Sequence, residues 1–297
     1  MDTQHKSNRA AFLALTANII WGFSFMATRI AIGHTSPSIL LSLRFIASFV
    51  IMLALLAAGI GRINLKGKPI GRFLLMGLCE PVMYFIAETN GIKYTTASFS
   101  GLMISLIPIG TVILSVFILK EPLSLKRMAW IIVSVAGVSI ISVSQRSEGV
   151  ISTRGILYLL IAIITASFYT ILSRSISDVF TAFERTFIMM LMGCIAFTAT
   201  AIAEMGKGFV PQMAAAACDI HVILPVLFLS VICSAVAFFC MNYAISYLDV
   251  NRVVVFANIT PVVSVLAGVL FLGEPFSLIY ILGIALILTG VYKVNRV

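Results

Sequence analysis

Long apolar runs alternate with short polar connections along the whole chain. An α-helix needs about 20 mostly apolar residues to cross the hydrocarbon core of a bilayer. The runs of about this length are 10–32, 36–59, 70–91, 95–119, 124–144, 153–173, 180–203, 221–246, 250–272 and 276–294. This pattern predicts an all-α integral membrane protein with ten transmembrane helices. The longest connection, 204–219, has too few residues for a separate soluble domain.

Composition supports the membrane interpretation. Of the 297 residues, 61% are hydrophobic and only 10% are charged, whereas soluble domains are about half apolar and a quarter charged. The first run, 10–32, is too long for a signal-peptide core, and no small-residue cleavage site follows it. We therefore expect this run to be retained as the first span.

The basic residues set the expected orientation. With the N-terminus in the cytoplasm, 14 of the 20 Lys and Arg residues fall on the inner side and 6 on the outer side. Cytoplasmic loops carry an excess of Lys and Arg, so we expect both termini to lie in the cytoplasm, with the chain multi-pass in the plasma (inner) membrane. Topology thus accounts for the net charge of +9, and we expect no nucleic-acid partner.

Two parts of the chain repeat each other at a shift of 153 residues. The shift superimposes Tyr94 on Tyr247, Pro108 on Pro261, and Glu121-Pro122 on Glu274-Pro275. Apolar matches carry little weight in such a sequence, but a shared Pro and a shared Glu-Pro at the same spacing do. A weaker match, at a shift of 145, places Arg29 on Arg174.

The repeat predicts the domain organisation: a cytoplasmic tail 1–9, a first five-helix repeat 10–144, a linker 145–152, a second repeat 153–294 and a cytoplasmic end 295–297. Because five spans is an odd number, the second repeat must be inverted relative to the first. Inverted repeats are typical of secondary transporters, in which one half rocks against the other around a central site.

The repeated motifs resemble a known family. A mid-span Pro is followed by Lys120-Glu121-Pro122 in one half and by Gly273-Glu274-Pro275 in the other, and Trp21-Gly22-Phe23 precedes Arg29. Together these resemble EamA-type transporters of the drug/metabolite transporter (DMT) superfamily, over 11–143 and 154–293. The resemblance implies ten helices, cytoplasmic termini and movement of small metabolites such as amino acids, often as export. Lys120, where the second copy has Gly273, departs from the repeat.

The duplicated residues have architectural explanations. Pro is tolerated at a helix start and an acidic side chain suits a helix N-terminus, so the Glu-Pro pairs predict capped turns, with gating as the alternative. Pro108 and Pro261 predict kinks in the fourth and ninth spans. These kinks serve packing, or they expose backbone carbonyls to a central cavity.

Glu80 is the sharpest candidate for function. It lies near the middle of the third span and its counterpart in the second half is Cys233. A charged side chain at this depth costs about 2.5–3.5 kcal/mol on insertion scales, so Glu80 must face the bundle interior, be paired or be protonated. At four-residue spacing, Glu80, Tyr84 and Glu88 form a polar stripe. We expect it to bind substrate, with Glu80 as coupling residue; the alternative is a structural ion pair with Arg44.

Further candidates lie on other spans. The first span carries a face with an aromatic centre, and the eighth and ninth carry polar and aromatic residues at mid-depth. Ordinary interhelical packing is the alternative for all of them. These candidates for substrate binding are Asn18, Trp21, Phe25, Phe238, Asn242, Tyr243 and Asn258.

Signatures of catalysis and cofactor binding are absent from the sequence. There is no GxxxxGK[ST], HExxH or GxSxG motif. The five cysteines show no CxxC spacing and the three histidines are far apart. We therefore expect no enzyme activity, cofactor or metal, and any pumping must draw on ion or substrate gradients.

The sequence thus predicts a secondary-active, alternating-access transporter of a small polar metabolite (an amino acid, amine or related compound), an exporter with its site between the repeats. Protons and membrane lipid are the other expected partners. Alternatives are a passive uniporter and, much further behind, a membrane-embedded enzyme or receptor. No strong apolar GxxxG motif is present, which favours a monomer.

Overall fold

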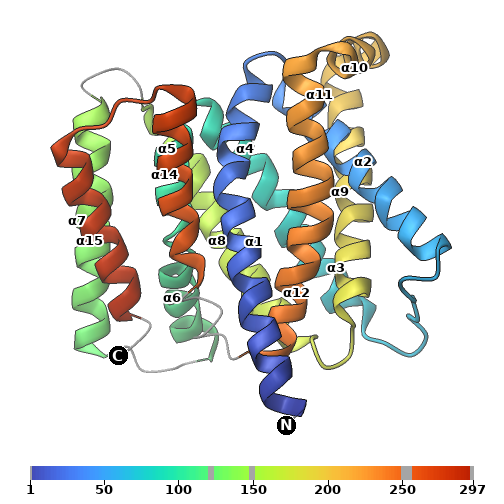
Figure 1. Ribbon diagram of the computed structural model, residues 1–297, viewed down its shortest axis with the longest axis horizontal. Coiled ribbons are helices and arrows are strands. Elements are labelled where there is room, and N and C mark those ends of the chain that lie inside the picture. The colour runs from blue at the N-terminus through green and yellow to red at the C-terminus, as the bar shows by residue number, and fades with distance from the viewer. Residues whose placement is uncertain (1, 120–123, 147–150, 249–255, 295–297) are drawn as a thin grey trace.

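A computed structural model describes residues 2–119, 124–146, 151–248 and 256–294. In these residues the protein is a bundle of helices packed side by side (Figure 1). Seven helical segments are long and apolar enough to cross a membrane, and three shorter apolar helices accompany them within the described residues. The start of α1 and the end of α15 lie at the same end of the bundle (Figure 1).

The first half of the chain begins with α1 (Asp2–Ile32) and α2 (Pro37–Ala57). Its third span is composed of α3 (Ile70–Gly77), the π-helical segment η1 (Leu78–Met83) and α4 (Tyr84–Lys93). Then follow α5 (Ala97–Ile104), α6 (Ile107–Leu119) and α7 (Leu125–Arg146). Because α1 already begins at Asp2, the polar stretch expected as a tail continues the first helix.

The second half begins with α8 (Thr153–Ser175) and α9 (Ala182–Met205). A short turn, η2 (Gly206–Gly208), leads to α10 (Phe209–Cys218), which lies at the end of the bundle opposite the termini (Figure 1). The eighth span consists of α11 (Ile220–Leu227), the π-helical η3 (Phe228–Ala237) and α12 (Phe238–Tyr247). The chain ends with α14 (Ile259–Leu272) and α15 (Leu278–Val294). The predicted connection 204–219 therefore contains a helix of its own.

Local sequence signals start the helices at corresponding places in the two halves. The Ser36 side chain caps α2 by accepting a hydrogen bond from the Ile39 N–H. At the position shifted by 145 residues, Thr181 caps α9 together with Glu184 in a capping box. Such caps satisfy backbone N–H groups that a helix leaves without partners.

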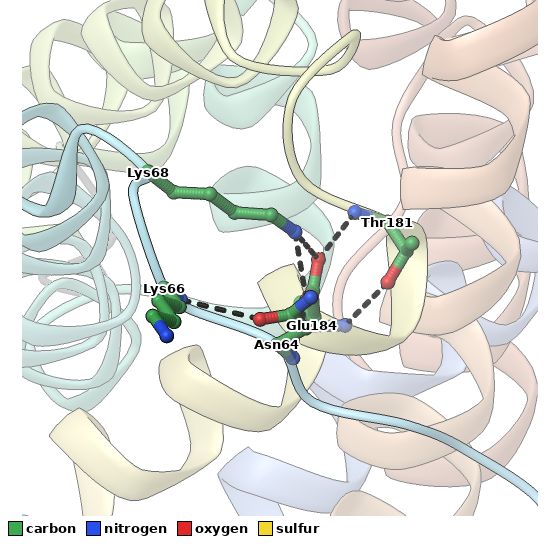
Figure 2. Close-up of polar contacts among 5 residues, drawn as sticks. All are labelled: Asn64, Lys66, Lys68, Thr181 and Glu184. Carbon is green, nitrogen blue, oxygen red and sulfur yellow. Dashed lines mark hydrogen bonds and ion pairs between the residues drawn. The ribbon is translucent and has the colours of Figure 1, made fainter.

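Glu184 also ties the connection after α2 to the start of α9 (Figure 2). One carboxylate oxygen accepts the Asn64 N–H at 2.8 Å, and Lys68 Nζ lies 2.8 and 2.7 Å from the two oxygens. The Glu184 side chain is 2% exposed. Because a buried carboxylate needs several donors, this cluster is a structural anchor between the halves.

The two halves contact each other through corresponding helices. Helix α1 of the first half packs on α14 and α12 of the second half, and its counterpart α8 packs on α6 and α4 of the first half. Helices α7 and α15 pack on each other at one side of the bundle (Figure 1). A Cβ on Gly137 would meet the Gly283 carbonyl and Leu286, so glycine lets α7 and α15 approach closely.

Each half is also interrupted at two matching places. The π-helical segments η1 and η3 widen the third and eighth spans. The fourth span breaks at Ser105 and Leu106, just before Pro108, and the ninth has a turn at Asn258, just before Pro261. Pro removes a backbone donor and clashes with the preceding turn, so the predicted kinks are present in both halves.

Of the two Glu-Pro connectors, only the second lies within the described residues. Glu121-Pro122 lies outside the described residues. In the second copy the Glu274 carboxylate accepts the N–H groups of Ala97 and Ser98 at 2.7 and 2.9 Å. It therefore caps the start of α5 in the other half, whereas the sequence suggested a turn local to its own helix.

Candidate substrate cavity between the two halves

A cavity of about 140 Å³ lies between the halves. Its walls come from α1, α2, η1, α4 and the α5–α6 break on one side, and from α8, α12 and the start of α14 on the other. Residues of η1, of the α5–α6 break and of the start of α14 therefore line the cavity. Irregular backbone at membrane depth is tolerated where it lines such a space.

Glu80 reaches this cavity because the third span is broken at that residue. Its backbone leaves the helical region, with φ −145° and ψ 118°, and Pro81 follows. The side chain lines the cavity and is 7% exposed. Among the described residues, no hydrogen bond or ion pair is made by the Glu80 carboxylate.

Tyr84 and Glu88 continue from Glu80 along the same wall. The Tyr84 hydroxyl donates a hydrogen bond to Glu88 Oε1 at 2.8 Å, and both side chains are buried. All three members of the predicted polar stripe line the cavity. The stripe forms even though the helix is interrupted at its first residue.

Arg44, on α2, faces the same cavity and is 2% exposed. Its Nε donates to Ser234 Oγ at 2.9 Å, and its guanidinium carbon lies 4.2 Å from the centroid of the Phe85 ring. Glu80 and Glu88 line the same cavity as Arg44. No oxygen of either carboxylate lies within 4 Å of an Arg44 nitrogen, so the ion pair considered from the sequence is not a direct contact.

An aromatic wall faces the polar groups. Trp21 Nε1 donates to the carbonyl oxygen of Cys233 at 3.2 Å, in the widened segment η3. The Trp21 and Phe238 rings lie 5.1 Å apart, centroid to centroid, edge to face. Phe25 also lines the cavity, which makes most of this wall apolar.

Asn18 joins the first half to the second at the cavity edge. Its Oδ1 accepts a hydrogen bond from Thr260 Oγ1 at 2.9 Å, and its Nδ2 donates to the Ala14 carbonyl. Both Asn18 and Thr260 line the cavity. All three candidates on the first span, Asn18, Trp21 and Phe25, therefore line the cavity.

Three residues singled out from the sequence do not line the cavity. Asn242 is buried behind it, where its Oδ1 accepts from Tyr169 and its carbonyl accepts from Arg185. Tyr243 lines a separate groove and lies under Arg9, whose guanidinium carbon is 5.4 Å from the ring centroid. The Asn258 Oδ1 is buried without a partner among the described residues.

Conversely, several cavity residues were not predicted. The most polar of them are Arg44, Ser105, Tyr169, Thr170 and Thr260. Arg44 could have been found by the argument applied to Glu80, since an ionisable residue within a span marks function by default. The hydroxyl residues gave no such signal, because Ser and Thr are common in transmembrane helices. Within the described residues, no group of metal-ligating side chains is arranged to hold an ion.

Comparison with known proteins identifies the family of this chain. The model of the EamA-like transporter family matches this chain twice, over residues 8–143 and 153–296. The chain belongs to the EamA-like transporter family. This confirms the resemblance inferred from the Glu-Pro repeats, and the two matched stretches coincide with the two structural halves.

Individual relatives cover almost the whole chain. An uncharacterized transporter of Bacillus subtilis, YcxC, is 26% identical over 98% of this chain and 94% of its own length. A probable terminal-alkyne amino-acid exporter of Streptantibioticus cattleyicolor is 22% identical over 98% and 95%. A probable amino-acid metabolite efflux pump of Salmonella typhimurium is 22% identical over 96% and 94%. One crystal structure, 20% identical, shares the fold with a TM-score of 0.62 over 96% of this chain and 95% of its own.

Proposed function

We propose that this protein is a secondary-active, alternating-access transporter that exports a small polar metabolite, an amino acid, amine or related compound, across the plasma membrane. The observation that carries the proposal is the cavity between the halves, into which Glu80 presents a buried carboxylate with no partner in the described chain. An uncompensated buried charge is strongly unfavourable. Substrate or a proton is the natural partner for this carboxylate.

Topology supports this role. We infer ten spans from the seven long and three shorter apolar helices of the described residues, and an even number of spans puts both termini on one side. The excess of Lys and Arg on that side assigns it to the cytoplasm. The breaks in the third, fourth and ninth spans then lie beside a site near the bilayer centre, as in transporters built from inverted repeats.

The relatives support the substrate class and the direction. Two of them carry names that refer to amino-acid export or amino-acid metabolite efflux. The cavity suits such a compound, since it combines carboxylates and a guanidinium with an aromatic wall. Glu80 is proposed to hold a cationic group of the substrate or to carry the coupling proton, in a chain that works as a monomer.

The experiment is a thermal-shift panel on the purified protein with amino acids, amines, organic acids and nucleosides. A ligand that binds only the folded state stabilises it by mass action. A stabilising compound whose effect disappears in Glu80→Gln supports the proposal. Glu204→Gln is the matched control, since Glu204 is exposed at the end of α9. A stabilising compound that acts equally on Glu80→Gln moves recognition away from the third span.

A further inference from the structure

We infer that Arg44 and Glu80 are the two ends of one recognition site, and that the cavity takes a zwitterion: the substrate's carboxylate on Arg44 and its ammonium group on Glu80. This inference rests on the proposed function and narrows it, because it excludes amines and organic acids that carry a single charge. It assigns Arg44 a substrate contact instead of a structural role.

The hydrogen bonds of Arg44 leave most of its donors free. An Arg side chain has five N–H donors, and only Nε is used, on Ser234 Oγ at 2.9 Å. Among the described residues, Nη1 and Nη2 have no hydrogen-bond or ion-pair partner, although the side chain is 2% exposed. Both nitrogens belong to a residue that lines the cavity. Together they form the planar edge of the guanidinium that can bind a carboxylate in a bidentate manner, with two parallel hydrogen bonds.

Arg185 is a second buried arginine in this bundle, and its hydrogen bonds can be compared with those of Arg44. It is 0% exposed and lies away from the cavity. Its Nη1 donates to Ser173 Oγ at 2.9 Å, and its Nη2 donates to the Asn242 carbonyl and to Ser246 Oγ, both at 2.6 Å. Protein atoms therefore accept from both terminal nitrogens of Arg185, whereas those of Arg44 donate to no group among the described residues and belong to a residue that lines the cavity.

Arg44 and Glu80 line the same cavity but make no direct ion pair with each other. No Glu80 oxygen lies within 4 Å of an Arg44 nitrogen. Phe85 holds the guanidinium from one side, with 4.2 Å from its ring centroid to the guanidinium carbon. Glu88 is engaged by the Tyr84 hydroxyl at 2.8 Å, which leaves Glu80 as the carboxylate without a donor. Opposite charges held apart at one cavity are complementary to a molecule that carries both.

The part of the cavity wall formed by aromatic side chains is apolar. Trp21, Phe25 and Phe238 line the cavity beside the charged groups, and the Trp21 N–H is already used on the Cys233 carbonyl. A substrate side chain placed there meets ring faces and edges without a free polar group. We therefore expect an apolar or aromatic amino acid, and phenylalanine is the probe.

The test compares three compounds with the same ring: phenylalanine with both charges, 2-phenylethylamine with only the ammonium, and 3-phenylpropionate with only the carboxylate. Affinities are measured by isothermal titration on the purified full chain. The wild-type protein is expected to bind phenylalanine at least about tenfold more tightly than either analogue, because each charged group lost leaves its buried partner unpaired.

Variants then assign each charge to its residue. Arg44→Gln should lose the preference for phenylalanine over the amine, and Glu80→Gln should lose the preference over the acid. Arg44→Lys keeps the buried charge if Arg44→Gln fails to fold, and it should bind phenylalanine more weakly than wild type while still favouring it over the amine.

Two results would overturn the inference: equal binding of 2-phenylethylamine and phenylalanine to the wild type, or no binding of phenylalanine. If either occurs while another compound still binds in a Glu80-dependent manner, the transport proposal stands and only the zwitterion falls. If no compound binds in a Glu80-dependent manner, both the transport proposal and the zwitterion inference are wrong.

Discussion

Arg29 donates a hydrogen bond from Nη1 to the carbonyl oxygen of Ile92 at 2.9 Å, which ties the end of α1 to the end of α4. Arg174 does the same in the second half, with Nη1 2.7 Å from the carbonyl oxygen of Ile245 at the end of α12. The two arginines are 145 residues apart and the two acceptors 153 apart, the same shifts that superimpose the repeats. The C-terminal carbonyls of a helix lack partners within the helix, so each half satisfies this need in the same way.

Alanine at either arginine is expected to lower the free energy of unfolding by about 0.5–1.5 kcal/mol, since each variant removes a charged donor from helix-end carbonyls. Thermal unfolding of Arg29→Ala and Arg174→Ala measures the loss. Lys207→Ala, at an exposed basic residue, is the control. A loss confined to one half would contradict the symmetric role of the two side chains.

Tyr84 and Tyr243 provide a matched pair of phenylalanine substitutions. Tyr84 donates to Glu88 in the cavity, whereas Tyr243 lines a separate groove. Tyr84→Phe is expected to weaken substrate binding by about tenfold, because Glu88 loses its donor. Tyr243→Phe should leave the affinity unchanged. Titration with the substrate measures both, and an equal effect of the two variants would mean that the cavity is not the binding site.

The Glu184 anchor should matter for stability and not for recognition. Glu184→Gln removes the ion pair with Lys68 at 2.7 Å, and we expect a loss of about 1–3 kcal/mol in the free energy of unfolding. Lys68→Ala should cost a similar amount, and the double variant less than the sum, since the residues share one contact. Additive losses in this thermal-unfolding cycle would show that the pair contributes nothing.

Glu274 lies in the connection from α14 to α15, at the end of the bundle opposite the termini (Figure 1), and caps α5 of the other half. In an alternating-access cycle this contact must open when the cavity opens on that side. Glu274→Ala is therefore expected to favour that state. In a chain without its native cysteines, Ser105→Cys in the cavity wall should react faster with an external, membrane-impermeant maleimide when Glu274 is replaced. An unchanged rate would show that the contact does not restrict opening.

The sequence predicted the elements well because bilayer thickness imposes long apolar runs and Pro imposes breaks. Glu80, Tyr84 and Glu88 were also foreseeable, since an ionisable residue at depth must face the interior and four-residue spacing keeps the stripe together. These are local properties of one helix. The repeats also predicted two related halves, and corresponding helices of the two halves pack on corresponding partners in the structure.

What the sequence could not supply depends on how neighbouring helices are rotated and paired. Tyr243 and Asn258 lie at plausible depth, but packing directs Tyr243 to another groove and leaves the Asn258 Oδ1 buried outside the cavity lining. Arg44 was considered only as a partner for Glu80, because nothing in the sequence shows that the two side chains stay more than 4 Å apart. Likewise, no local sequence pattern indicates that Glu274 caps a helix of the other half.

The most direct test of transport at Glu80 measures uptake of the best-stabilising compound into proteoliposomes, with and without an imposed proton gradient, for the wild type and Glu80→Gln. Our account predicts that a gradient drives accumulation by the wild type, and that Glu80→Gln inserts normally but transports almost nothing. Wild-type transport that equilibrates without concentrating the compound would indicate a passive facilitator. Full gradient-driven transport by Glu80→Gln would contradict the account, because the unpartnered carboxylate in the cavity would then have no part in the cycle.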